Sequence, residues 1–326
     1  MPRMARRITV DILTGFLGSG KTTLLNRLLV TPGFGNVAVV VNELGEIGLD
    51  HLLVEQRSDQ IALLEGGCLC CAVVDSLPET LLELCRKRAG GELPAFDRIV
   101  IETTGLADPG PIAEVIRRSP LLAHFLVPGI VVTALDASGR WDAVERHPEA
   151  TAQLVLADRI ILTKLDLRDA WDETDEQRLR ALNPFAEIVD AFAIVADSGR
   201  LVAPVPALAP RPPAAPARHS HGVEAQYFAV AGEVTRAGLA ALAGALAHRL
   251  GVRLLRCKGV LRVAGRAILV QGVGARFHFA DAPASAVSAP SGLTCIVQHV
   301  QPEEIETLLR WLFVPEGTQP PAPEDL

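Results

Sequence analysis

The first part of the chain alternates short, almost continuous apolar runs with segments whose apolar positions recur every three or four residues. Runs such as 37–41 and 99–101 consist of Val, Ile and Ala, which is typical of strands buried on both faces of a parallel sheet. The regular alternation of strand and helix therefore predicts a doubly wound α/β domain. We expect strands at residues 8–13, 36–41, 60–64, 98–102, 129–136, 159–163 and 187–189, and helices beginning near Lys21, Leu77, Pro111, Pro148 and Asp172.

The pattern changes where six prolines occur among alanines between Ala203 and Pro216. Such a segment is too rigid and too poor in backbone donors for regular structure, so residues 203–222 are predicted to be a linker after a first domain at 1–202. The following pattern predicts a smaller α+β domain at 223–316 and a loose tail at 317–326. Its expected elements are strands at 226–230, 252–263, 267–270, 275–279 and 293–300, a helix at 236–250 and a last helix after Pro302.

Composition excludes two classes of partner. The net charge is −7 and no long basic stripe is present, so the chain is not expected to bind nucleic acid through phosphates. The most apolar stretch, residues 121–135, is interrupted by His124, Pro128 and Gly129, so no membrane span is expected.

Three of the six Cys lie within residues 68–71, which is not a disulfide framework. We therefore expect a cytoplasmic protein whose thiols bind metal or do redox chemistry.

A glycine-rich motif, Gly15-Phe16-Leu17-Gly18-Ser19-Gly20-Lys21-Thr22, lies between the first predicted strand and the first predicted helix. In this pattern backbone N–H groups and a helix N-terminus surround the phosphates of a nucleotide, and the Lys contacts the β- and γ-phosphates. The Thr hydroxyl binds Mg²⁺. The motif predicts a phosphate-binding loop (P-loop), with Lys21 in a catalytic role. The predicted nucleotide contacts are Gly15, Gly18, Ser19, Gly20, Lys21, Thr22 and Thr23.

The predicted strand at 98–102 ends in Glu102-Thr103-Thr104-Gly105. A carboxylate at the carboxyl end of a buried parallel strand is where such folds order Mg²⁺, and a glycine three residues later can contact the γ-phosphate. Acidic residues also end strands simply because they are solvated there. Together with the P-loop, however, the motif favours Glu102 as a Mg²⁺ ligand and catalytic residue and Gly105 as a γ-phosphate contact.

Another apolar strand is followed by Thr163-Lys164-Leu165-Asp166. A carboxylate at this position can accept hydrogen bonds from N1 and the exocyclic amine of guanine, and the alkyl part of Lys164 can lie along the base. A plain Lys-Asp turn is the alternative. Its place downstream of the P-loop favours guanine binding by Thr163, Lys164 and Asp166. Because Thr163 stands where Asn is usual, base selectivity is assigned to Asp166.

Cys68, Cys70 and Cys71 follow a Gly-Gly pair directly after the strand predicted at 60–64. Three thiolates suit Zn²⁺, and also Co²⁺, Ni²⁺ or Cu⁺, with a fourth position left to a carboxylate, water or a partner's thiol. A site with one open position favours metal transfer over permanent structure. A redox pair of Cys68 and Cys71 is the alternative. The remaining cysteines, Cys85, Cys257 and Cys295, are expected to be buried as small apolar side chains.

Two further pairs of polar residues have open interpretations. Glu43 and Glu46 follow the second predicted strand and are candidates for the missing metal ligand or for a Mg²⁺ contact, although an ordinary charged loop explains them equally well. His219 and His221 follow the proline-rich segment and are candidates for delivering metal. A solvated loop is the simpler interpretation of so short a pair.

Taken together, these motifs resemble those of the CobW-type metallochaperone GTPases, which are related to the zinc-regulated GTPase metalloprotein activators and to the maturation GTPases for urease and hydrogenase. The resemblance extends to the C-terminal domain through Arg256-Cys257-Lys258-Gly259 and Gln271-Gly272-Val273. The chain departs from the family pattern in Thr163 and in lacking a long His-rich stretch between its domains. The motifs that carry the resemblance are 15–23, 42–46, 66–71, 102–109 and 163–166.

The resemblance implies slow GTP hydrolysis with Mg²⁺, with GTP or GDP as bound nucleotide. It further implies a metal, Zn²⁺ first and Co²⁺ or Ni²⁺ as alternatives, held by Cys68, Cys70 and Cys71 and passed to a client metalloprotein in a nucleotide-dependent way. A homo-oligomer that depends on nucleotide or metal is compatible with this scheme. Two other functions compete with it: a metal sensor or storage protein with an incidental GTP site, and a P-loop kinase acting on a small molecule.

Overall fold

The computed structural model describes residues 7–31, 34, 36–41, 72–139, 141–167, 171–203, 205 and 220–312. The chain divides into two compact units. Residues 1–171 and 187–205 form the first unit, and residues 172–186 and 206–326 form the second. The sequence predicts one continuous first domain at residues 1–202, whereas the structure groups residues 172–186, which lie inside that range, with the second unit.

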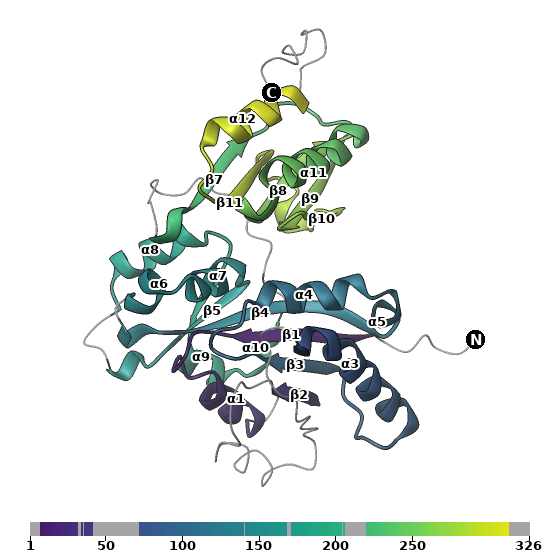
Figure 1. Cartoon of the computed structure of the whole chain (residues 1–326), viewed down its shortest axis with the longest axis vertical. Helices are drawn as coiled ribbons and strands as arrows, with labels where there is room; N and C mark the ends of the chain where they lie inside the picture. The colour runs from purple at the N-terminus through teal and green to yellow at the C-terminus, as the bar shows by residue number, and fades with distance from the viewer. Residues whose placement is uncertain are drawn as a thin grey trace. The chain divides into compact units, whose positions relative to one another are not determined.

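The first unit is built on a parallel sheet, seen at the centre of its ribbon in Figure 1. The order of its described strands is β2-β3-β1-β4-β5-β6, and every neighbouring pair is parallel. All carboxyl ends therefore lie at one edge, as predicted for a doubly wound fold. The strands are β1 (Ile8–Thr14), β2 (Val37–Val41), β3 (Arg98–Glu102), β4 (Leu126–Asp136), β5 (Arg159–Thr163) and β6 (Glu187–Asp190).

Both faces of this sheet are covered by helices. On one face, α3 (Ala72–Gly90), α4 (Pro109–Arg118) and α5 (Pro120–Phe125) pack on alternate residues of β1, β2 and β3. On the other face, α1 (Lys21–Leu29), α9 (Ala191–Ala196) and α10 (Gly199–Val202) pack on the intervening residues. Because both faces are buried, most strand positions are apolar, and the buried Asp11 of β1 is an exception that pairs with Arg98 of β3. Two helices, α6 (Asp142–Arg146) and α7 (Pro148–Leu156), connect β4 to β5.

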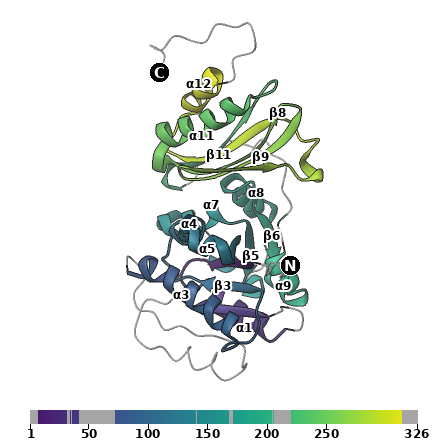
Figure 2. The ribbon, with the colours of Figure 1, turned by 90° about the vertical axis from the view of Figure 1, so that its right-hand side faces the viewer.

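The second unit contains an antiparallel sheet with the strand order β10-β9-β8-β11-β7. Its helices α11 (Arg236–Leu250) and α12 (Pro302–Leu312) pack on one face and close the larger apolar core of this unit (Figure 2). Helix α8 (Glu173–Leu182) contacts β7. The strands are β7 (Val223–Ala229), β8 (Leu254–Val263), β9 (Arg266–Val273), β10 (Arg276–Asp281) and β11 (Gly292–Gln298).

The segment after α8 is held by two cations of β8. The guanidinium of Arg256 lies 5.7 Å from the centroid of the Phe185 ring, and Nζ of Lys258 lies 5.5 Å from it. Phe185 is buried. Cys257, between the two cations in sequence, belongs to the apolar core that α11 and α12 cover. This alternation is the expected period of a strand. The Arg-Cys-Lys motif of the sequence therefore clamps an aromatic ring of the second unit through cation–π contacts.

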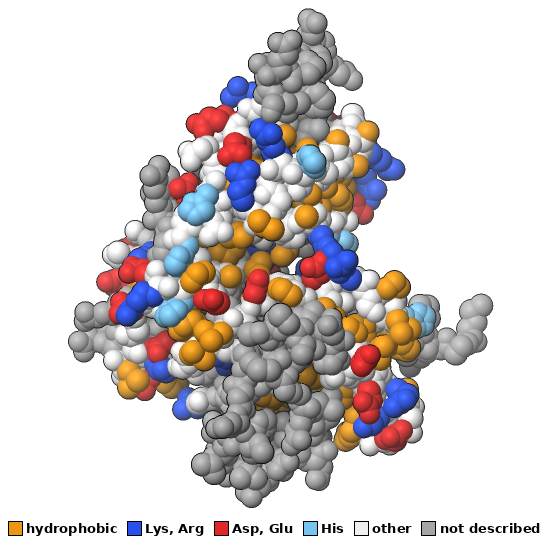
Figure 3. Space-filling model, in the orientation of Figure 1, with side chains coloured by type: hydrophobic (Ala, Val, Ile, Leu, Met, Phe, Trp, Pro, Cys, Tyr) orange, Lys and Arg blue, Asp and Glu red, His pale blue; other side chains and the backbone are white. Residues whose placement is uncertain are grey.

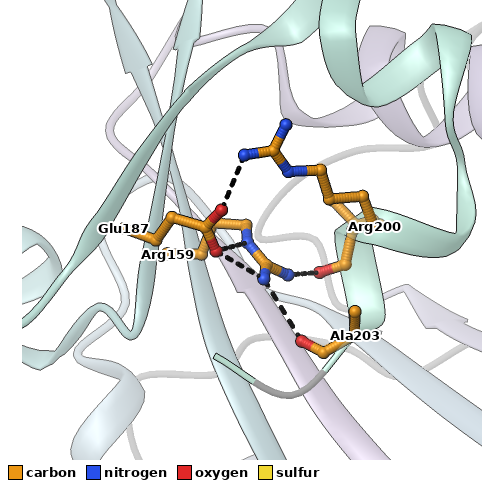
Figure 4. Close-up of polar contacts among 5 residues, drawn as sticks. Arg159, Glu187, Arg200 and Ala203 are labelled. Atoms are coloured by element: carbon orange, nitrogen blue, oxygen red, sulfur yellow. Dashed lines mark hydrogen bonds and ion pairs between the residues drawn. The ribbon is translucent and has the colours of Figure 1, made fainter. Parts of the chain in front are cut away.

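A buried charge fixes the end of the first unit (Figure 4). Arg159, at the start of β5, is 1% exposed, and its guanidinium donates to Glu187 Oε2 at 3.0 and 2.7 Å and to the carbonyls of Leu201 and Ala203. Arg200 donates to the other oxygen of Glu187 at 2.8 Å. Burial raises the pKa of Glu187, but the hydrogen bonds from Arg200 and Arg159 outweigh it and hold that pKa below its usual value. The segment leaving α10 is thus tied to β5 and β6.

Strands were easier to predict than short helices. The strands at 98–102 and 159–163 lie where predicted, and the strand expected at 60–64 lies outside the described residues. Helix α3 begins at Ala72, five residues before the predicted start at Leu77, and Pro78 lies inside it. The sequence pattern predicts none of the helices α5, α6, α9 and α10, because each is at most six residues long. Such segments hold too few turns for an apolar period.

Within the described part of the chain, no helix combines the length and apolarity needed to cross a membrane. Basic and acidic side chains are interspersed on the face of the molecule shown in Figure 3. On helix α3, the ammonium of Lys87 pairs with Glu83 at 2.9 Å one helical turn away.

Candidate nucleotide-binding site

The P-loop leaves the carboxyl end of β1 and adopts a conformation that needs glycine. Gly15, Gly18 and Gly20 have φ angles of 145°, 73° and 84°. A Cβ at Gly15 would lie 2.4 Å from the carbonyl oxygen of Ala134 and 2.6 Å from Oγ of Ser19, so this glycine also permits close approach to β4. Gly20 caps α1, whose first residue is Lys21. The loop therefore presents a helix N-terminus to the carboxyl edge of the sheet.

Lys21 lies folded against its own loop. Its Nζ donates to the carbonyl oxygens of Gly15 at 2.8 Å and Phe16 at 3.3 Å, and the residue is 9% exposed. The compact ammonium is thus already positioned beside the P-loop backbone. An ammonium has three N–H donors, so it can donate hydrogen bonds to these two carbonyls and to a phosphate at the same time.

Thr22 and Glu102 are brought together by the sheet register. Leu13 pairs with Glu102 across β1 and β3, which places the end of β3 beside the P-loop. Thr22 Oγ1 donates to Glu102 Oε1 at 2.6 Å. A hydroxyl and a buried carboxylate that converge in this way are hard oxygen ligands of the kind Mg²⁺ prefers. The residues present therefore fit the ion expected from the sequence.

The loop after Glu102 packs closely against the P-loop. Thr103 Oγ1 donates to Thr14 Oγ1 at 2.8 Å, and the Thr103 amide donates to the carbonyl of Leu13 at 2.9 Å. A Cβ on Gly105 would lie 2.6 to 2.8 Å from three atoms of Leu17, among them its amide nitrogen and Cα. Only glycine allows the two backbones this contact. Gly105 is therefore held against the loop that is predicted to surround the phosphates.

These elements enclose a cavity of about 420 Å³ at the carboxyl edge of the sheet. Of the residues predicted to contact the nucleotide or its Mg²⁺, the structure brings eight to this cavity: Gly18, Gly20, Lys21, Thr22, Thr23, Glu102, Gly105 and Lys164. Its remaining lining residues are Leu17, Val41, Thr103, Thr104 and Leu106. Gly15, Ser19, Thr163 and Asp166 do not line it.

Thr163 supports the P-loop from behind. Its Oγ1 lies 2.7 Å from the carbonyl oxygen of Ser19 and 3.0 Å from that of Leu135, so the hydroxyl bridges the P-loop, β5 and β4. Thr163 is buried, and the side chain is engaged with these two carbonyls. The sequence predicts a base contact at this position, and the structure shows the hydroxyl against two backbone carbonyls.

Lys164 is fixed by Asp136, a residue for which the sequence pattern predicts no role. Lys164 has a φ of 56°, and its Nζ lies 2.6 Å from Asp136 Oδ2. Asp136 also accepts from the amide of Ser138 at 2.9 Å. Burial raises the pKa of Asp136, but the hydrogen bonds from Lys164 and Ser138 outweigh it and keep that pKa below the usual range. Asp166 follows in a short 3₁₀ turn, Leu165–Leu167, and is exposed.

Comparison with known proteins identifies both parts of the chain. Residues 9–190 match the family model described as the CobW/HypB/UreG nucleotide-binding domain. The chain belongs to the CobW/HypB/UreG family. Residues 223–312 match the C-terminal domain of the cobalamin synthesis protein cobW, so the CobW pattern covers both units.

The chain is also similar in sequence to named zinc chaperones. The chain is 39% identical over 182 residues to the zinc chaperone YjiA of Escherichia coli, covering 56% of each protein. It is 31% identical to the zinc chaperone CobW of Pseudomonas aeruginosa, covering 84% of this chain and 83% of that one. The matched region thus spans about half of the first relative's length. A crystal structure of a zinc-bound triple mutant of the YjiA GTPase matches with a TM-score of 0.70 at 25% identity, over 94% of this chain and 99% of that one.

The metal-binding motif predicted for this CobW-family chain, Cys68, Cys70 and Cys71, lies outside the described residues, as do Glu43, Glu46 and His219. The part of the chain that the structure describes contains no group of three or more His, Cys, Asp or Glu side chains arranged to hold a metal ion. The other three cysteines are buried, as predicted, and Sγ of Cys257 lies 3.7 Å from Sγ of Cys295.

Proposed function

We propose that this CobW-family chain is a slow GTPase that carries a transition metal, Zn²⁺ in the first place, to a client metalloprotein. The observation that carries the proposal is the convergence of Lys21, the Thr22–Glu102 pair and Gly105 around one cavity at the carboxyl edge of the sheet. The names of the relatives, zinc chaperones and zinc-regulated GTPases, support the choice of cargo.

In this proposal the nucleotide is GTP or GDP, and Asp166 selects guanine by accepting from its N1 and exocyclic amine. The ammonium of Lys21 neutralises charge on the β- and γ-phosphates. Thr22 and Glu102 would hold Mg²⁺, which when bound supplies further positive charge to the same phosphates. Gly105 brings backbone donors close to the γ-phosphate.

Zinc is the cargo, and Cys68, Cys70 and Cys71 are its proposed ligands. In the sequence, the motif lies between the end of β2 at Val41 and the first residue of α3, Ala72. If the presence of the γ-phosphate changes the arrangement of this region, GTP and GDP change the affinity for zinc, and zinc changes the affinity for GTP by the same factor. This linkage is what makes delivery depend on the nucleotide.

The proposal is tested by titrating Zn²⁺ into the full chain loaded with GTP analogue, loaded with GDP, and free of nucleotide. We expect zinc affinities that differ between the nucleotide states. Replacing Cys70 and Cys71 by Ser should abolish tight zinc binding and leave GTP binding intact. Lys21→Ala should weaken GTP binding and leave zinc binding intact. Equal zinc affinity in all three states would refute the linkage, and unchanged zinc affinity in the Cys variant would place the ligands elsewhere.

The same samples separate the competing functions. A kinase would transfer the γ-phosphate of GTP to an added small acceptor and would be indifferent to loss of the thiols. A storage protein would bind several metal ions per chain and hydrolyse little GTP. Capture of a metalloprotein by the GTP-loaded form, and not by the GDP-loaded form, is the outcome expected of a chaperone.

A further inference from the structure

A buried glutamine on α7 makes contacts that the proposed nucleotide chemistry does not yet use. Gln153 is 1% exposed, and its side-chain Nε2 donates to the carbonyl oxygens of Gly105 at 3.1 Å and Ala107 at 2.9 Å. An amide nitrogen has two hydrogens, so both are used on one loop. Because carbonyls only accept, these contacts also fix which end of the amide faces the loop.

The loop that Gln153 holds is the one predicted to contact the γ-phosphate. Gly105 lies between two supports: Leu17 of the P-loop, which leaves no room for a Cβ, and Gln153 of α7. Because the peptide is trans and planar, a Gly105 carbonyl directed at Gln153 directs the following N–H of Leu106 the other way. Gly105 and Leu106 both line the nucleotide cavity.

Gln153 is itself anchored. Thr133 of β4, which is 1% exposed, donates its hydroxyl hydrogen to the main-chain carbonyl of Gln153 at 2.8 Å. The side chain therefore extends from a helix that a central strand holds in place. Such a rigid support defines the position of the loop more closely than the loop's own backbone does, because residues 103–108 contain no regular structure before α4 begins at Pro109.

We propose that Gln153 is a positioning residue for GTP hydrolysis: it holds the Gly105 loop so that its backbone donors meet the γ-phosphate. The inference rests on the proposed GTPase function. It predicts different effects on the two nucleotides, since GDP has no γ-phosphate and its binding does not depend on this loop. Loss of the Gln153 donors lowers affinity for GTP and its turnover, and spares affinity for GDP.

The test uses Gln153→Met in the full chain, which keeps the side-chain volume and removes both donors. We expect unchanged GDP affinity, an affinity for a non-hydrolysable GTP analogue about tenfold lower, and a kcat for GTP at least about tenfold lower. Gln153→Glu, which sets carboxylate oxygens against the two carbonyls, should act in the same direction. Equal losses for GDP and the analogue, or no loss for either, would overturn the proposal.

Thr151→Val is the matched control. Thr151 lies on the same helix, is 3% exposed and also donates to a main-chain carbonyl, but this carbonyl is that of Val144, at 3.0 Å, and not one of the Gly105 loop. We expect it to leave the ratio of analogue to GDP affinity unchanged. If Thr151→Val lowers this ratio as much as Gln153→Met does, the effect is general damage to α7 and the proposal is wrong.

A measurement on the wild-type chain is independent of how the variants fold. Amide hydrogen exchange of residues 104–108 should be slower with the GTP analogue than with GDP, and equal exchange in the two states would contradict the inference. Failure of the proposed function has a different result, because a wild-type chain that binds no guanine nucleotide at all would remove both proposals together. A chain that binds GTP analogue and GDP equally well would remove only the role of Gln153.

Discussion

At the scale of single residues, the four lysines among 31 basic side chains divide into distinct environments. Lys21 and Lys164 line the nucleotide cavity, Lys258 lies over the Phe185 ring, and Lys87 pairs with Glu83 on the solvent-facing side of α3. At the first two positions the ammonium lies within 3 Å of one oxygen, the carbonyl of Gly15 for Lys21 and the carboxylate of Asp136 for Lys164. A compact charge fits there, whereas the planar guanidinium of Arg is suited to two parallel hydrogen bonds.

Thr163 yields a prediction that separates support of the P-loop from recognition of the base. Because its hydroxyl bridges Ser19 and Leu135, Thr163→Val should weaken binding of GTP and GDP together, by about 1 kcal/mol or roughly fivefold for one lost hydrogen bond. The preference for guanine over adenine nucleotides should not change. Nucleotide titrations measure both quantities.

Asp166→Asn is the companion variant. We expect it to lower the preference for guanine, since an amide offers one acceptor where a carboxylate offers two. A Thr163→Val variant that lost guanine preference while Asp166→Asn kept it would reverse the roles assigned to these two residues.

At the scale of elements, Arg159 connects β5, β6 and the end of α10. Replacing it by Met removes a buried guanidinium and leaves the carbonyls of Leu201 and Ala203 without their donor. We expect a loss of about 3 kcal/mol in the free energy of unfolding, as is usual when one member of a buried ion pair is removed. Urea unfolding of the first unit measures it, and a loss below about 1 kcal/mol would mean that Arg200 alone satisfies Glu187.

The partner of Arg159 predicts a pH dependence. The pKa of Glu187 is lowered on folding, so its ion pairs stabilise the fold above the ordinary value of 4.5 and lose their effect as the pH falls through the lower, folded value. Glu187→Gln should therefore be less stable than wild type at pH 7, and the difference should shrink below pH 4.5. Unfolding curves at several pH values test this, and a constant difference would show that the charge of Glu187 contributes nothing.

The elements also show what a sequence pattern can predict. The Val- and Ile-rich strands and the P-loop were predictable because their residue types serve one local geometry, and the Gly15–Gly20 spacing identifies its function directly. Gln153 could not be found in this way, since one glutamine in a helix has no motif and its role arises only when α7 meets the Gly105 loop. Asp136 ends a strand like many other acids and became informative only through its contact with Lys164.

At the scale of the whole molecule, the chain passes between its two units three times, near residues 171, 186 and 205. Helix α8 and Phe185 are encoded between two strands of the first sheet, yet belong to the second unit. No local signal in the sequence indicates this, because the amphipathic pattern of a helix does not say which sheet it will cover. The turn with Asp166 is therefore followed, within a few residues, by an element of the other unit.

This arrangement predicts that Phe185→Ala destabilises the second unit. Phe185 is 4% exposed, and its loss should cost about 3 kcal/mol and speed amide exchange in β8 and β11. Phe192→Ala is the control, because Phe192 is 56% exposed and should cost less than about 0.5 kcal/mol. Faster exchange confined to β3 and β5 would place Phe185 energetically in the first unit instead.

Helix α8 is separated in sequence from the rest of the second unit, and this has a consequence for a chain that a protease has cut. A protease acting between residues 206 and 218 would leave α8 on the N-terminal fragment and β7, which it contacts, on the C-terminal one. The two fragments would then stay together without a covalent link, and separately expressed halves should reassemble. The protein would behave as a natural split protein, whose nicked form elutes as one particle and separates only in denaturant.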